Sequence, residues 1–127
     1  MKLAVVGSRS FQYDFNAKVG AIYLICDKIE ELKIDHLVSG GAKGPDHWGE
    51  EAAGNYHLST TIYKPNWNKH GKAAGFIRNE LIIDAADHVL LFWDGKSRGT
   101  KHDLDLARKK GKNYELFVWE KENWTLK

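Results

Sequence analysis

The sequence predicts a three-layer α/β fold, in which about five strands form a doubly wound parallel sheet with four helices on its faces. Short apolar runs alternate with amphipathic helical segments along the 127 residues, which is the pattern of repeated β-α units. Each crossover helix must cover a sheet face and the crossovers are right-handed, so a doubly wound sheet is the economical solution. Residues 88–93 are continuously apolar, as expected of a central strand covered on both faces.

The first predicted elements lie within residues 3–33. Residues 3–6 form an unbroken apolar run that ends at a glycine, which indicates a buried strand. Residues 16–33 place apolar side chains at intervals of three and four, which is the spacing of a helix with one buried face. Asn16 or Asp14 is suited to cap this helix, because either side chain accepts a hydrogen bond from a free backbone N–H.

The next elements begin with a short strand at residues 36–39, which leads into a glycine-rich loop. Pro45 suits the first position of a helix, so we expect a helix from Pro45 to about Asn55. Residues 60–63 are rich in β-branched side chains and form the third predicted strand. This strand should end before Pro65, because proline cannot donate to a sheet ladder.

The rest of the chain continues the alternation. A polar loop around Trp67 leads into a helix over residues 74–85 and then into the strand at 88–93. The core stripe predicted for that helix consists of Ala74, Ile77, Leu81 and Ala85. A loop at 94–99, a helix at 100–110 and a strand at 114–119 follow. No linker or repeat interrupts this order, so we expect residues 1–127 to form a single domain.

Composition limits the class of protein. The 43% hydrophobic and 28% charged residues are typical of a globular domain. The single cysteine, Cys26, allows no internal disulfide, and no apolar stretch has the length of a signal peptide or a membrane span. We therefore expect a cytoplasmic protein without membrane contact. The net charge of +2 is too small for bulk electrostatic binding of nucleic acid, so an anion site would be local.

Ligands of doubly wound sheets bind beyond the carboxyl ends of the strands, where the strand order reverses, so the loops at 7–15, 39–45, 64–72 and 94–100 are candidates. The segment Ser39–Asp46, SGGAKGPD, leads into a helix start, where free backbone N–H groups attract an anion. It lacks P-loop spacing, and the first strand lacks a dinucleotide-binding glycine pattern, which argues against an NAD dehydrogenase. A tight turn that caps the helix is the alternative interpretation.

Three further side chains are suited to binding a nucleotide. Arg9 follows the first strand, and a guanidinium there can hold a phosphate through two parallel hydrogen bonds. Trp67 is surrounded in sequence by lysines and a histidine, an arrangement suited to stacking a base beside its phosphates. Arg78 lies near the start of its predicted helix and therefore near the crevice mouth. The alternatives are surface arginines and a tryptophan that covers the sheet edge.

Thr100 and Asp103 have two interpretations. A threonine followed three residues later by an acid is a capping box, which would only begin the helix at residue 100. The same two side chains also lie beside the predicted crevice. A metal site is not expected, because the histidines are scattered and His47 with Glu50 supplies only one helical turn of ligands.

Several segments taken together resemble the YspA-like branch of the SLOG superfamily over nearly the whole chain. They are Val6–Arg9 (VGSR), Val38–Asp46 (VSGGAKGPD), Lys64–Trp67 (KPNW), Gly71–Asn79 (GKAAGFIRN) and Gly99–Thr100. That superfamily consists of Rossmann-like domains and also contains the Lonely Guy phosphoribohydrolases and DNA processing protein A. The resemblance implies a pocket for a nucleotide or nucleotide-derived ligand, and many members resemble sensors of such molecules.

The resemblance to the Lonely Guy enzymes is narrower. Arg78 and the segment Gly99-Thr100-x-x-Asp103 are similar to that family's helix arginine and G-T-x-x-E segment. The acid is aspartate instead of glutamate, and the sequence Asp94–Thr100 replaces the family's P-G-G-x-G-T loop. Hydrolysis of an N-glycosidic bond, with Asp103 stabilising the developing positive charge, is therefore the alternative to binding alone.

We expect a protein that binds a small nucleotide-like ligand, ADP-ribose-like or cyclic, as a sensor or a sequestering protein, without a cofactor or a metal. The alternatives are a phosphoribohydrolase with Arg78 and Asp103 as catalytic residues, and a single-stranded nucleic acid binder by analogy with DNA processing protein A. The expected ligand-binding residues are Gly7, Ser8, Arg9, Gly40, Gly41, Ala42, Lys43, Gly44, Asp46, Trp67, Arg78, Asn79, Gly99, Thr100 and Asp103.

Two expectations concern partners. Nucleic acid is expected to be an unlikely partner because the net charge is small. A homodimer is expected, both from the superfamily resemblance and because five tryptophans are hard to bury in one small core. Trp48 and Trp124 are the tryptophans expected to be exposed.

Overall fold

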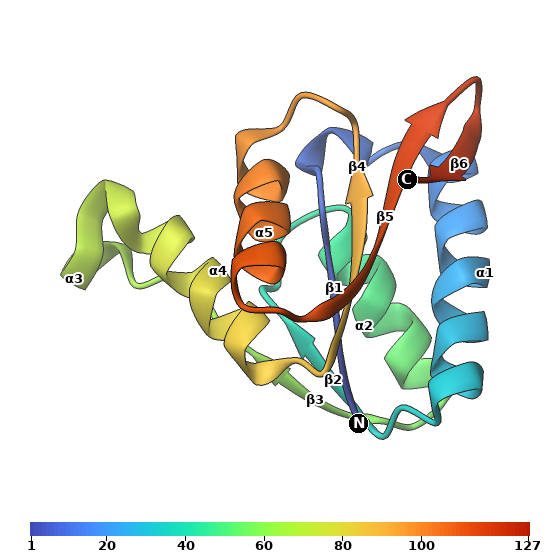
Figure 1. Ribbon diagram of the computed structural model, residues 1–127, viewed down its shortest axis with the longest axis horizontal. Helices are drawn as coiled ribbons and strands as arrows, with labels where there is room; N and C mark the ends of the chain where they lie inside the picture. The colour runs from blue at the N-terminus through green and yellow to red at the C-terminus, as the bar shows by residue number, and fades with distance from the viewer.

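Six strands form one sheet in the order β3-β2-β1-β4-β5-β6 (Figure 1). The computed structural model describes residues 1–127. The strands are β1 (Lys2–Gly7), β2 (His36–Ser39), β3 (Ser59–Ile62), β4 (His88–Trp93), β5 (Asn113–Glu120) and β6 (Asn123–Leu126). The first five strands run parallel, and β6 pairs with β5 in the antiparallel direction. The predicted doubly wound parallel sheet is confirmed, with one strand more than expected.

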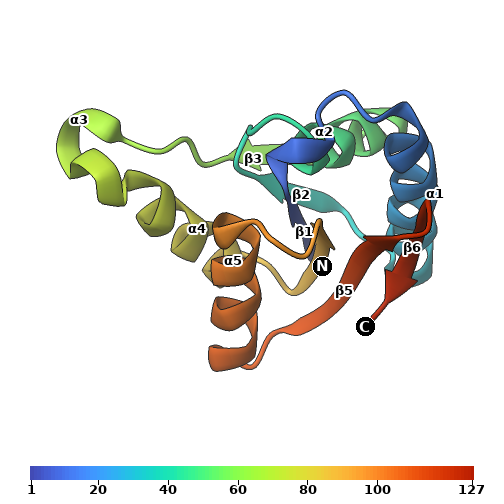
Figure 2. The ribbon, with the colours of Figure 1, turned by 90° about the horizontal axis from the view of Figure 1, so that it is seen from above.

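Helices cover both faces of the sheet (Figure 2). They are α1 (Phe15–Leu32) and α2 (Pro45–Asn55) on one face, and α4 (Ala74–Ala85) and α5 (Arg98–Lys109) on the other. Alternate side chains of β1 enter two separate cores, with Leu3 in the core beneath α1 and α2 and Ala4 in the core beneath α4 and α5. None of these helices combines the length and the apolar character needed to cross a membrane.

The chain reverses its direction of travel across the sheet between β1 and β4. It moves outward from β1 through β2 to β3, and it then returns to pair β4 with β1 and continues through β5. The loops after β1 and β4 meet at the carboxyl edge, where the Ser8 N–H donates to the Phe92 carbonyl oxygen at 3.0 Å. Gly7 permits this approach, because a Cβ there would lie 2.4 Å from the same oxygen.

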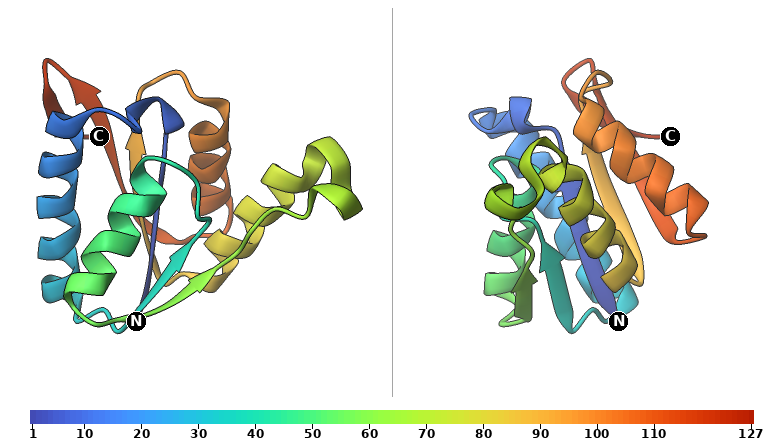
Figure 3. Two further views of the ribbon diagram at one scale, coloured as in Figure 1. Left: turned by 180° about the vertical axis from the view of Figure 1, so that it is seen from behind. Right: turned by 90° about the vertical axis from the view of Figure 1, so that its left-hand side faces the viewer.

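Local signals place the helix starts where the sequence predicts them. Asp14 is the N-cap of α1, and its carboxylate accepts a hydrogen bond from the Ala17 N–H at 3.0 Å. Pro45 is the first residue of α2. The predicted polar loop around Trp67 instead contains a short helix, α3 (Trp67–His70), capped by the Asn66 side chain. In Figure 3 α3 and the start of α4 project beyond the sheet as an arm.

The buried face of α4 differs from the predicted stripe. Ile77 and Leu81 are 37% and 49% exposed, whereas Arg78 and Asn79 are buried together with Ala74, Ile82 and Ile83. A buried arginine is tolerated when its donors are paired, and the Arg78 guanidinium donates to three groups of its surroundings. The predicted stripe was wrong because two adjacent faces of α4 both carry apolar residues. The face with Arg78 and Asn79 is the buried one, since these polar side chains find hydrogen-bond partners inside the protein.

The tryptophans are accommodated inside the domain. Trp48 is 3% exposed, and Trp124 on β6 is partly buried, with its indole N–H donating to the Ala17 carbonyl oxygen at 2.9 Å. The Phe11 ring contacts both indoles, at centroid distances of 6.1 Å and 5.0 Å. The expectation that these two tryptophans are exposed is therefore wrong, because the unpredicted β6 brings Trp124 onto the core. This argument for a homodimer therefore fails, and the homodimer stays a prediction.

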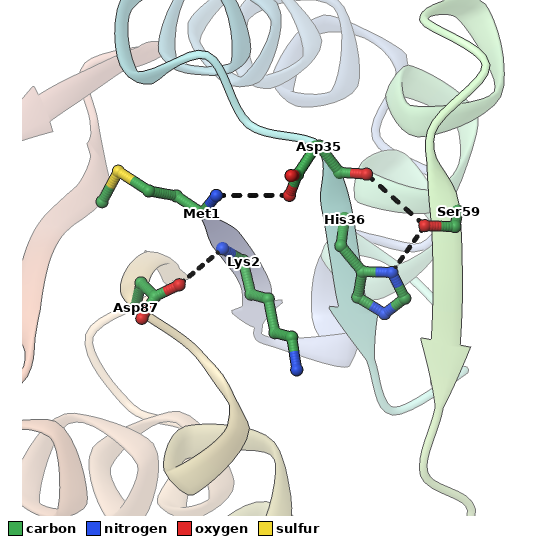
Figure 4. A network of polar contacts seen from close by, with 6 residues as sticks. All are labelled: Met1, Lys2, Asp35, His36, Ser59 and Asp87. Carbon is green, nitrogen blue, oxygen red and sulfur yellow. Dashed lines mark hydrogen bonds and ion pairs between the residues drawn. The ribbon is translucent and has the colours of Figure 1, made fainter.

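A polar network closes the amino edge of the sheet (Figure 4). The Asp87 carboxylate accepts from the Lys2 backbone N–H at 2.7 Å, which ties the loop before β4 to the start of β1. The His36 ring pairs with the Ser59 hydroxyl at 2.7 Å, which ties β2 to β3. These polar groups have partners within the chain.

Candidate functional site

A cleft of about 520 Å³ opens at the carboxyl edge, where the loops after β1 and β4 meet α2, α4 and α5. The topology predicts this position, because the strand order reverses between β1 and β4. The volume is typical of small-ligand pockets. The predicted site residues that line the cleft are Gly7, Arg9, Ala42, Asp46, Trp67, Arg78, Asn79, Gly99, Thr100 and Asp103.

The other predicted site residues, Ser8, Gly40, Gly41, Lys43 and Gly44, do not line the cleft. Three of the glycine-loop N–H groups are already paired: those of Gly40 and Ala42 donate to Asp46 Oδ2 at 3.1 Å and 3.4 Å, and that of Gly41 donates to the Ser39 hydroxyl at 3.2 Å. These three N–H groups are therefore engaged within the chain, and phosphate binding by the loop stays a prediction. The loop folds around the Asp46 carboxylate.

Arg78 is the buried cation at the centre of the site. The residue is 7% exposed, and its guanidinium donates to the Gly40 carbonyl oxygen at 2.8 Å and to Asn79 Oδ1 at 3.0 Å. Gly40 leaves the room for this contact, since a Cβ there would lie 2.7 Å from Arg78 Nη1 and 2.8 Å from Asp46 Oδ2. The glycine therefore serves the close approach of an arginine and a carboxylate.

Two buried carboxyl groups share this single cation. Burial raises the pKa of Asp46 to about 6, against the opposing effects of Arg78 and of the two loop N–H donors. Burial also raises the pKa of Asp103 well above its usual range, the neighbouring Asp46 raises it further, and Arg78 opposes both. Asp103 Oδ1 is buried and has no hydrogen-bond partner within the chain. An unpaired buried acceptor that lines a cleft is available to a ligand.

The capping-box interpretation of Thr100 and Asp103 is wrong. α5 begins at Arg98, and its N-cap is Ser97, whose hydroxyl accepts from the Thr100 N–H at 3.4 Å. The Thr100 hydroxyl pairs with the Ser8 hydroxyl at 3.2 Å, which joins the loop after β1 to α5. Asp103 is thereby free of a capping role and lies on the buried face of α5.

The mouth of the cleft carries exposed cations and aromatic rings. Trp67 is 54% exposed and Phe76 is 48% exposed, and both line the cleft from the arm formed by α3 and the start of α4. Arg9 and Lys72 are exposed lining residues that make no ion pair or side-chain hydrogen bond within the chain. Lys64, Lys69 and His70, the other basic residues around Trp67, do not line the cleft.

The lining residues that the sequence interpretation missed are Val6, Ser10, Lys72, Gly75, Phe76, Ile82, Asp94 and Ser97. A signal existed for Lys72, Gly75 and Phe76, because they fall within the quoted segment Gly71–Asn79. No sequence signal singles out Ser10 and Asp94, whose side chains bond each other at 2.7 Å. Their pairing depends on the meeting of the loops after β1 and β4.

Comparison with solved structures identifies the fold. DNA processing protein A from Streptococcus pneumoniae superimposes with a TM-score of 0.70 over 92% of this chain, at 23% identity. The protein of the same name from Helicobacter pylori superimposes with a TM-score of 0.68 over 93% of this chain, at 25% identity. The chain has the Rossmann-like fold of DNA processing protein A. It spans 49% and 64% of those two proteins, respectively. These neighbours support the SLOG resemblance, and the YspA-like branch stays a prediction.

Sequence comparison finds a relative in a bacteriophage. The Gene 61 protein of Mycobacterium phage D29 is 37% identical over 82 residues, which cover 59% of this chain and 65% of that protein. The chain therefore spans less than two thirds of this relative and of both structural neighbours. No family model matches the sequence.

These neighbours correct one expectation. The Helicobacter pylori DNA processing protein A has a described single-stranded DNA binding mode, so the expectation that nucleic acid is an unlikely partner is wrong. The expectation relied on the net charge of +2, which averages over the whole chain. The physical reason for the error is that cations such as Arg9 and Lys72 gather locally at the carboxyl edge.

Proposed function

We propose that the carboxyl-edge cleft binds a nucleotide unit of single-stranded DNA. The observation that carries this proposal is that one cleft is lined by two half-exposed aromatic rings and by two cations without a partner in the chain. The rings are those of Trp67 and Phe76, and the cations are Arg9 and Lys72. Aromatic rings stack on any base, and cations beside them neutralise the phosphates, which is how sequence-tolerant single-strand binders work.

A structural neighbour supports the same function. The Helicobacter pylori neighbour binds single-stranded DNA, and the superposition with it covers 93% of this chain. A single strand also fits the chemistry of the cleft better than a duplex does, because stacking on Trp67 requires a base that is free of its own stack. The two rings belong to α3 and the start of α4, which form the arm that projects beyond the sheet (Figure 3), and both rings are about half exposed.

Fluorescence anisotropy with a labelled oligothymidylate of about twelve nucleotides tests the proposal. We expect saturable binding to the single strand and much weaker binding to the matching duplex. The double variant Trp67→Ala, Phe76→Ala should bind about 10–100-fold more weakly, because each stacked base contributes about 1–3 kcal/mol. The matched control is Phe15→Ala, Tyr23→Ala, which removes two rings of α1 that are 72% and 70% exposed.

The outcomes separate clearly. Loss of affinity in the double variant with wild-type affinity in the control supports the cleft as the binding site. Equal losses in both variants, or equal affinity of the wild-type protein for the duplex, would overturn the proposal. Thermal unfolding of each variant, followed by circular dichroism, distinguishes lost contacts from lost structure.

A second candidate function rests on Asp103, whose Oδ1 is buried without a partner in the same cleft. Cleavage of a nucleoside monophosphate at its N-glycosidic bond would use this carboxyl group, as the resemblance to the Lonely Guy enzymes implies. Burial raises the pKa of Asp103 well above its usual range, which favours the protonated form and suits donation to a leaving base better than stabilisation of a cation. Release of free base that disappears in Asp103→Asn would establish this activity.

A further inference from the structure

A second cavity of about 370 Å³ adjoins the cleft on the side of α5. Its lining residues are Phe76, Trp93, Lys96, Arg98, Lys101, His102 and Asp105. Phe76 lines both cavities, so its ring forms the boundary between them. No part of the proposed function uses this second cavity.

The charge in the second cavity is strongly positive. Lys96 and Arg98 are exposed and make no ion pair within the chain. Lys101 pairs with Asp105 at 2.7 Å, and this aspartate is the only carboxylate among the lining residues. The cavity thus concentrates an excess of positive charge as large as that of the whole chain, which is +2. Such a concentration favours an anion at this place.

The walls of the second cavity are held in place by contacts inside the chain. The Trp93 indole N–H donates to the Ser97 carbonyl oxygen at 3.1 Å. The His102 ring lies 4.6 Å from the Phe76 ring in an edge-to-face arrangement and pairs with the Asn79 side chain at 3.4 Å. Asn79 in turn accepts from Arg78, so these contacts link the second cavity to the buried cation of the cleft. The two cavities are therefore neighbours on one fixed surface.

We propose that the second cavity is a phosphate subsite for the neighbouring nucleotide of the strand, with Lys96 and Arg98 as its binding cations. This inference rests on the proposed function, because it requires a strand whose first nucleotide occupies the cleft. A strand that leaves the cleft past Phe76 enters the second cavity directly, and its next phosphate meets the two cations that have no partner in the chain.

The salt dependence of binding tests this subsite. Each phosphate contact of a single strand contributes a slope of about −0.7 to the plot of log affinity against log salt. The double variant Lys96→Gln, Arg98→Gln removes both cations from this one phosphate, so it should bind the oligothymidylate with a slope shallower by about 0.7 and with a loss of about tenfold at low salt. The matched control Lys2→Gln, Lys33→Gln removes two exposed cations at the amino edge and should retain both the slope and the affinity.

A gain in affinity provides a check that misfolding cannot imitate. Asp105→Asn removes the carboxylate of the second cavity and releases Lys101 from its ion pair, so binding at low salt should tighten a few-fold. An unchanged slope in Lys96→Gln, Arg98→Gln and an unchanged affinity in Asp105→Asn, while Trp67→Ala, Phe76→Ala weakens binding as expected, would overturn the subsite and leave the proposed function standing. Absence of single-strand binding in the wild-type protein would overturn both.

Discussion

Both edges of the sheet carry carboxylates, but these carboxylates differ in exposure and in whether they have a partner. At the amino edge the N-terminal ammonium pairs with Asp35 at 3.2 Å, and the Asp87 carboxylate accepts from the Lys2 N–H (Figure 4). These groups are exposed, and each has a partner. At the carboxyl edge Asp103 is 5% exposed, and its Oδ1 has none. One edge closes the fold and the other retains unused hydrogen-bonding capacity.

The difference places the unpaired buried carboxyl oxygen at the carboxyl edge, where the cleft lies. A buried carboxyl group without a partner is destabilising, because the chain supplies nothing that replaces its water. Burial also raises the pKa of Asp46, which lies beside Arg78, to about 6, and the sequence alone does not indicate this. Groups of this kind concentrate at functional sites.

Loss of the buried cation should have the largest effect. Arg78→Leu leaves Asp46 and Asp103 without their only cation, so we expect the free energy of unfolding near neutral pH to fall by about 3–5 kcal/mol. Removal of an amino-edge carboxylate by Asp87→Ala should cost about 0.5–1.5 kcal/mol, because it breaks one exposed hydrogen bond. Urea unfolding measures both. Similar losses in the two variants would contradict the contrast between the edges.

The pH dependence of stability should show the next largest effect. The pKa of Asp46 rises from 3.8 to about 6 on folding, so the folded state binds more protons than the unfolded state between these values. Stability is then fully present below about pH 4 and is lost as the pH rises through about 6, with a total loss of about 2–3 kcal/mol from this group.

Urea unfolding of the wild type and of Asp46→Asn at several pH values isolates this contribution. The asparagine keeps an oxygen that accepts from the Gly40 and Ala42 N–H groups. The difference in stability between the two proteins should shift in favour of the variant as the pH rises from 4 to 7. A difference that stays constant over this range would show that Asp46 titrates normally.

The smallest expected effect is an increase in stability instead of a loss. Asp103→Asn removes a carboxyl group whose ionisation burial and Asp46 both oppose, so stability at about pH 8 should rise slightly. Affinity for the strand should change by at most a few-fold, since an amide retains the size and hydrogen-bonding capacity of the site. Thermal unfolding and anisotropy measure the two quantities. Destabilisation by this substitution would mean that Asp103 has a structural role.

Much of the fold could be predicted because short-range chemistry determines it. The Pro45 start of α2 and the Asp14 cap of α1 depend on a few adjacent residues, and the apolar run of β4 reports its burial on both faces. The antiparallel β6 was missed because Trp124 and its neighbours become a strand only by pairing with β5. That pairing is a tertiary property without a local signal.

The site was predicted in position but less well in detail. The cleft lies where the strand order reverses, between β1 and β4, as doubly wound sheets lead one to expect. The glycine-rich loop contributes Ala42 to its lining. The pairing of the loop N–H groups was missed because the sequence does not reveal that Asp46, six residues after Gly40, turns back to accept them. The burial of Arg78 was missed for the same reason, since its partner is the carbonyl oxygen of Gly40 in a distant loop.

Backbone amide chemical shifts during titration with the oligothymidylate test the role of the carboxyl edge most directly. The changes should be confined to the loops after β1 and β4, to residues 67–79 on the arm, and to the start of α5. The amides of Asp35, Ser59 and Asp87 at the amino edge should stay in place (Figure 4). Saturable changes at the amino edge, with none around Trp67 and Arg78, would contradict the assignment of the binding site.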